Sequence, residues 1–175
     1  MSLAIDTRSF RTSSQHAVGQ TSAIDGIFAG AIGAGLLALF FLGYDLITTE
    51  AFRTPSLVGQ VLLAGIAPAS APAVDVAMVA LFSPVHLAAF AIFGWATYAL
   101  VARLGQRVSF VALAIGCSVE LQLGVCAVSS VLAPGLVSAI GAGAVLVGNA
   151  IAGIGVAASL RAAQRGWDGM PHGLF

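Results

Sequence analysis

Four apolar stretches, each long enough to cross a bilayer, constrain this chain more than any other feature. They cover approximately residues 24–48, 76–101, 108–132 and 136–160. A transmembrane helix needs about 20 predominantly apolar residues to cross the hydrocarbon core. Within that core a helix can satisfy all of its backbone hydrogen bonds internally. The sequence therefore predicts an all-α fold, a bundle of four transmembrane helices in residues 24–160, between polar tails at 1–23 and 161–175.

The low charge content excludes several classes of protein. Only 8% of the 175 residues are charged and 59% are hydrophobic, whereas a soluble domain carries about 25% charged residues. Basic and acidic residues balance to a net charge of zero, so the chain lacks the basic surface that a nucleic-acid partner requires. It also has no P-loop, no Gly-rich nucleotide motif and no nucleophile–base spacing. We therefore expect neither nucleic-acid binding nor enzymatic activity.

The arginines predict the orientation of the bundle in the membrane. With four spans, six of the seven fall on one side: Arg8, Arg11, Arg103, Arg107, Arg161 and Arg165. Arg53 alone falls on the other side. Cytoplasmic loops of membrane proteins carry the excess of Lys and Arg, so both termini are expected in the cytoplasm.

Local signals predict how the spans begin and connect. A capping-box pattern at Ser22–Asp25 predicts the start of the first helix, and the Asp75 carboxylate suits the positive end of the second. The short connections at 103–107 and 133–135 predict that the second, third and fourth spans pack as consecutive neighbours. The outer loop contains an apolar segment, residues 55–66, in which Pro55 can occupy the first helical position. We expect this segment to form a short interfacial helix.

Glycines mark the expected contacts between helices. Lipid provides no hydrophobic drive for transmembrane helices to associate, and small residues instead allow their backbones to approach closely. Two sets of glycines recur at intervals of three, four or seven residues on one helix face, and both predict packing surfaces. These are Gly26, Gly30 and Gly33 in the first span and Gly141, Gly148 and Gly155 in the fourth.

Four polar side chains within the spans form the candidate site: Asp45, His86, Glu120 and Asn149. Counting from the arginines places Glu120 and Asn149 near the midplane, His86 about one turn further out and Asp45 near the outer boundary. Ionisable residues within a membrane are costly and suggest function. One interpretation is a shared pocket for a proton, an ion or the polar head of a ligand. The other is a structural network of hydrogen bonds.

Cofactors are not predicted. A zinc site needs three or four ligands, and His86 with Glu120 supplies two, so no metal site is expected. The remaining alternative is that His86 ligates a pigment or haem.

The third span carries a second polar face, two residues away from Glu120. It comprises Ser118, Gln122, Cys126 and Ser129, at intervals of four, four and three. Polar side chains are costly against lipid, so this face predicts an interface with another membrane subunit or with a second copy of the chain. The alternative is that the Gln122 side chain extends towards the membrane interface or bonds to its own backbone.

Several motifs together resemble a group of small bacterial integral membrane proteins with four helices and no assigned activity. The chain has Asp45-Leu46 and the pattern F-x-T-P-x-L-x-G at Phe52–Gly59, followed by His86 and by Gly148-Asn149. Thr49–Ala51 stands where such proteins often have Gly-x-Pro. The resemblance implies a location in the bacterial inner membrane.

Three functions are compatible with these observations. The first is a non-catalytic accessory subunit of a larger bacterial membrane complex, such as a bioenergetic or photosynthetic one. The second is a small proton- or ion-coupled transporter or channel that uses Glu120 and His86, as a homodimer. The third is a lipid- or pigment-binding membrane protein.

Overall fold

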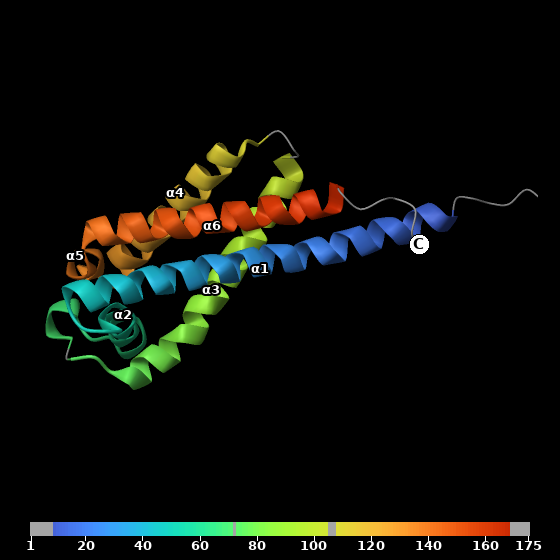
Figure 1. Cartoon of the computed structure of the whole chain (residues 1–175). Helices are drawn as coiled ribbons and strands as arrows, with labels where there is room; N and C mark the ends of the chain where they lie inside the picture. The colour runs from blue at the N-terminus through green and yellow to red at the C-terminus, as the bar shows by residue number, and fades with distance from the viewer. Residues whose placement is uncertain (1–8, 72, 105–107, 169–175) are drawn as a thin grey trace, which may run out of the picture.

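The computed structural model describes residues 9–71, 73–104 and 108–168 of the chain (Figure 1). Within these ranges every regular element is helical, and no strand occurs. The elements, in chain order, are α1 (Ser9–Thr48), α2 (Arg53–Ala64), the 3₁₀ turn η1 (Pro68–Ser70), α3 (Val76–Leu104), α4 (Phe110–Val131), α5 (Leu136–Ile140) and α6 (Ala142–Asp168).

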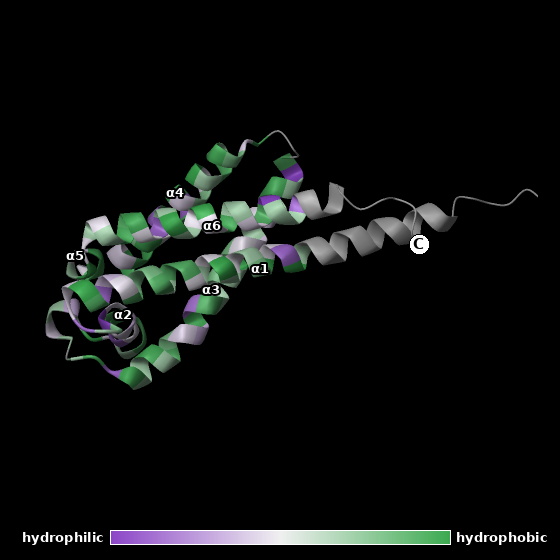
Figure 2. Ribbon diagram, in the orientation of Figure 1, coloured by the Kyte–Doolittle hydropathy of each residue, from purple (hydrophilic) through white to green (hydrophobic). Residues whose placement is uncertain are grey.

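The prediction of an all-α chain with four potential membrane spans is confirmed. Four helical segments among the described residues are long and apolar enough to cross a membrane: Ala23–Thr48, Val76–Leu104, Phe110–Val131 and Ala142–Gln164. Figure 2 shows hydrophobic residues along most of the coloured length of α1, α3, α4 and α6. The chain is therefore a multi-pass membrane protein.

The helices do not pack in the predicted sequential order. α1 lies at the centre and packs against both α3 and α6, while α4 packs against the other side of α6. The pairing of α4 with α6 agrees with the short connection at 133–135, which predicts that these two spans are neighbours. The expectation that α3 and α4 are also neighbours is wrong, because these two helices make few direct contacts. Figure 1 shows α3 crossing α1 obliquely instead.

Three predicted boundaries differ from the structure. α1 begins at Ser9 and continues through the Ser22–Asp25 pattern, so this pattern does not start a helix. α6 begins at Ala142 rather than at 136, because Gly141 has a φ of 107° that interrupts helical geometry after the short α5. α2 begins at Arg53, two residues before Pro55. At the start of α3, in contrast, the carboxylate of Asp75 accepts the backbone N–H of Ala77 at 2.9 Å, as a capping residue does.

Glycines allow α1 and α3 to touch through their backbones. A Cβ atom added at Gly26 would lie 2.9 Å from the carbonyl oxygen of Gly94. One added at Gly30 would collide with the carbonyl oxygen of Phe90, and one at Gly94 with that of Gly26. Gly94, which the sequence analysis did not single out, thus completes the crossing.

The remaining glycines of the two predicted sets also contact other parts of the same chain. A Cβ atom added at Gly33 would lie 2.6 Å from Val156, and one added at Gly148 would lie 2.8 Å from Leu37. At Gly141 the added atom would lie 3.2 Å from the Tyr44 hydroxyl. At Gly155 it would collide with Leu36. These glycines therefore serve packing between α1 and α6 or at the end of that pair.

Candidate functional site

A cavity of about 830 Å³ lies between α1, α3 and α4, with α2 and α5 at one end. Its volume falls in the range of about 300–1,000 Å³ that is usual for small-molecule sites. The walls are predominantly apolar, and the polar side chains in them are Thr54, Ser83, His86, Glu120 and Asn149. The cavity is partly open, and the two helices that make few mutual contacts, α3 and α4, both line it.

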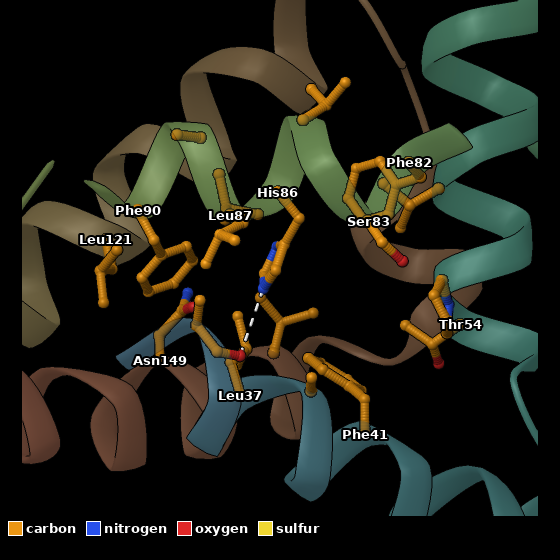
Figure 3. A pocket seen from close by; sticks show the side chains of 18 of the residues that line it. Leu37, Phe41, Thr54, Phe82, Ser83, His86, Leu87, Phe90, Leu121 and Asn149 are labelled. Carbon is orange, nitrogen blue, oxygen red and sulfur yellow. Dashed lines mark hydrogen bonds between the residues drawn. The ribbon is translucent and has the colours of Figure 1, made fainter. Parts of the chain in front are cut away.

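His86 projects from α3 across the cavity towards α1 (Figure 3). Its ring lies between those of Phe82 and Phe90, with centroid separations of 5.6 and 4.9 Å. All three residues lie on one face because positions four apart are neighbours on a helix. The Nε2 atom lies 3.4 Å from the carbonyl oxygen of Ala34. When Nε2–H donates to that oxygen, Nδ1 is left as a hydrogen-bond acceptor.

Asn149 reaches the cavity from α6 and is 2% exposed. Its Nδ2 donates a hydrogen bond of 2.9 Å to Oε1 of Gln122 on α4. A buried amide thereby obtains a partner across the α4–α6 contact, as buried polar groups generally require.

This bond gives the polar face of α4, at which a partner was predicted, a contact within the chain. Gln122 faces α6. Ser118 packs so closely against α6 that a Cβ atom added at Gly153 would collide with the Ser118 hydroxyl. Ser129 is buried and donates to the carbonyl oxygen of Ala133 at 3.2 Å. The small residues of α6 let α4 approach and cover this face, so its polar groups are satisfied within the chain. Of the four, Cys126 is the one that is exposed.

Glu120 lies on the other side of α4. Its side chain lines the cavity and is exposed. The structure therefore places His86, Glu120 and Asn149 around one cavity, each from a different helix. The bond of Asn149 to Gln122 also fits the interpretation as a structural network.

Asp45 has a separate role at the end of the bundle. It is 1% exposed, and its carboxylate accepts the backbone N–H of Thr54 at 2.7 Å and the Thr54 hydroxyl at 2.6 Å. Thr54 is the second residue of α2, where backbone N–H groups lack partners within the helix. Asp45 therefore ties the start of α2 to α1 and does not line the cavity.

A second buried contact, which the sequence analysis missed, holds α2 against α3. The Ser56 hydroxyl accepts the backbone N–H of Asp75 at 2.8 Å and Nε2 of Gln60 at 2.9 Å. A Cβ atom at Gly59 would lie 2.8 Å from the carbonyl oxygen of Met78. Four residues of α2 line one end of the cavity: Thr54, Pro55, Val58 and Leu62. The contacts of Ser56 and Gly59 therefore hold this end wall of the cavity in place.

No protein-family model, curated protein or solved structure matches this chain. Among the described residues, no three His, Cys, Asp or Glu side chains are grouped so that they could hold a metal ion. The cavity combines predominantly apolar walls with a few polar side chains, a lining that suits an amphipathic organic molecule.

Proposed function

We propose that this chain binds a largely apolar, amphipathic molecule of the membrane, a lipid or a pigment, in the cavity between α1, α3 and α4. The observation that carries the proposal is the cavity itself, about 830 Å³ in volume with predominantly apolar walls. Interiors of proteins are normally packed with few voids larger than a water molecule. An apolar space of this size within a membrane domain is therefore suited to an apolar occupant.

The arrangement of α3 supports entry from the bilayer. Most of its length is exposed, and it makes few contacts with α4 although both helices line the cavity. In a membrane, an opening between these helices faces lipid rather than water. A membrane-dissolved molecule can reach His86, Glu120 and Asn149 by this route without crossing an aqueous phase.

We further propose that the chain lies in the bacterial inner membrane with both termini in the cytoplasm and α2 at the outer interface. The last turn of α3, which contains Arg103, and the C-terminal part of α6, which contains Arg161, lie at the end of the bundle opposite α2 (Figure 1). Arg53 is the first residue of α2. This distribution supports the orientation expected from the positive-inside rule.

The other two functions are supported less directly. The accessory-subunit hypothesis depended on the polar face of α4, and Gln122 has its partner in Asn149 within the chain. Ion transport requires a polar path, whereas the walls of this cavity are mainly apolar. Both remain predictions from the sequence.

Filling the cavity should displace its occupant. Gly124 lines the cavity, and a Cβ atom added there would meet nothing within 4 Å. We expect Gly124→Phe to fold normally and to weaken the affinity for the bound lipid or pigment about tenfold, equivalent to about 1.4 kcal/mol of binding free energy, so that a smaller fraction of the protein carries a bound molecule. Native mass spectrometry after gentle extraction from membranes measures this fraction, and a visible absorption band would identify a pigment.

Gly116→Phe is the matched control. Gly116 is on the same helix and also has open space around it, but it does not line the cavity. This variant should keep the bound molecule. Equal occupancy in the two variants, or wild-type protein that carries no bound molecule, would contradict the proposal.

A further inference from the structure

Glu120 lacks a partner in a place where a carboxyl group needs one. It lies near the middle of α4, lines the cavity and forms neither a hydrogen bond nor an ion pair with any residue that the structure describes. An acidic side chain near the bilayer centre costs about 2.5–3.5 kcal/mol, and such residues usually pair with another group. A group from outside the chain can supply this partner.

Polar neighbours of Glu120 on α4 are already engaged elsewhere. The Ser118 hydroxyl donates to the carbonyl oxygen of Ala114 at 2.8 Å. Gln122 bonds to Asn149 on the opposite side of the helix. Among the residues described, Glu120 is also the one polar side chain of α4 that lines the cavity.

The charges around the cavity favour a cationic occupant. Glu120 is the one acidic side chain among its described lining residues, and no arginine contributes to the walls. Arg53, Arg103 and Arg161 lie at or near helix ends. The other titratable side chain in the walls is His86, whose Nε2 is directed to the carbonyl oxygen of Ala34.

Aromatic rings in the walls provide a second feature that suits a cation. Five phenylalanines line the cavity: Phe41, Phe52, Phe82, Phe90 and Phe93. The negative face of an aromatic ring attracts a cation within about 6 Å, most strongly where water is excluded. A carboxylate combined with such rings recognises an organic cation, and neither group attracts an anion.

We infer that the molecule bound in the cavity is a lipophilic cation, an ammonium or similar charge on an apolar body, and that Glu120 binds its charged head. This inference rests on the proposed function and specifies its ligand class. The apolar body fills the cavity between α1, α3 and α4, and the charge pairs with the Glu120 carboxylate. No covalent step is involved.

Binding of tetraphenylphosphonium to the full-length protein in a non-ionic detergent tests this inference. The expected result is saturable binding to the wild type, a loss of affinity of at least about tenfold in Glu120→Gln, equivalent to about 1.4 kcal/mol, and affinity closer to that of the wild type in Glu120→Asp. Tetraphenylborate, an anion of nearly the same shape, should not bind. Gly116→Phe should bind tetraphenylphosphonium as the wild type does.

Two results would overturn the inference: unchanged affinity for tetraphenylphosphonium in a folded Glu120→Gln variant, or equal binding of the cation and the anion. Circular dichroism and gel filtration establish that each variant is folded. If tetraphenylphosphonium fails to bind while Gly124→Phe still displaces a co-purified molecule, the ligand class is wrong and the proposed function stands. If Gly124→Phe displaces nothing, the proposed function fails as well.

Discussion

Replacing Gly30 with leucine is expected to separate α1 from α3 and to destabilise the protein by about 3 kcal/mol or more. The backbones touch here, since a Cβ atom at Gly30 would collide with the carbonyl oxygen of Phe90. A backbone atom cannot rotate away as the end of a flexible side chain can. Titration of the detergent-solubilised protein with sodium dodecyl sulfate, followed by circular dichroism, measures the change in the free energy of unfolding.

Gly43→Leu is the control for this prediction. Gly43 is also in α1, but a Cβ atom there would meet nothing within 4 Å. Since leucine favours a helix over glycine by up to about 1 kcal/mol, this variant should be as stable as the wild type or more so. Equal stability of Gly30→Leu and Gly43→Leu would mean that α1 and α3 do not cross at this glycine.

The second large effect is expected from Asp45→Ala, which removes both hydrogen bonds to Thr54. The backbone N–H and the hydroxyl of Thr54, a buried residue, would lose their acceptor, at a cost of about 1–3 kcal/mol for each unsatisfied group. We expect a loss of about 3 kcal/mol in stability and detachment of α2 from the end of the cavity. Amide hydrogen exchange across α2 should accelerate accordingly.

Two further variants separate this contact from general effects of substitution. Thr54→Val removes the hydroxyl and retains the backbone N–H, so it should cost roughly half as much as Asp45→Ala. Asp25→Ala removes from the same helix a carboxylate that forms no hydrogen bond with the residues the structure describes. It should leave exchange in α2 unchanged. Slow exchange of α2 in Asp45→Ala would show that another contact holds this helix.

Much of the fold could be predicted because bilayer thickness and backbone hydrogen bonding leave few alternatives. Length and hydropathy identify all four spans, since a stretch such as Val76–Leu104 is long and apolar enough to cross a bilayer. The start of α1 could not be predicted, because a capping pattern at Ser22–Asp25 does not prevent a helix from continuing through it. The prediction that consecutive spans pack as neighbours was wrong for α3 and α4. The crossing at Gly30 and Gly94, rather than the connection after α3, determines where α3 packs.

The candidate site was partly predictable for a related reason. Polar residues within spans are rare and costly, so His86, Glu120 and Asn149 are conspicuous in the sequence, and the structure places them around one cavity. Helical periodicity separates the Gln122 face from the Glu120 face, but it cannot tell which of them meets α6. An external partner at Gln122 could therefore be predicted from the sequence, but its bond to Asn149 could not.

The contact between Asp45 and Thr54 was not predicted from the sequence. It requires the chain to reverse between α1 and α2, and Phe52 adopts a left-handed φ of 65° at that reversal. Non-glycine residues take this conformation infrequently, and no local sequence signal marks Phe52 for it. The spacing of nine residues between the two side chains is equally uninformative without the turn.

An electron-density map of the protein crystallised from a lipid mesophase tests the central claim, an occupied apolar cavity, most directly. We predict that α3 and α4 remain apart and that continuous density from a bound molecule extends between His86 and Glu120. Direct packing of α3 against α4, with side chains filling the space between these two residues, would contradict the claim.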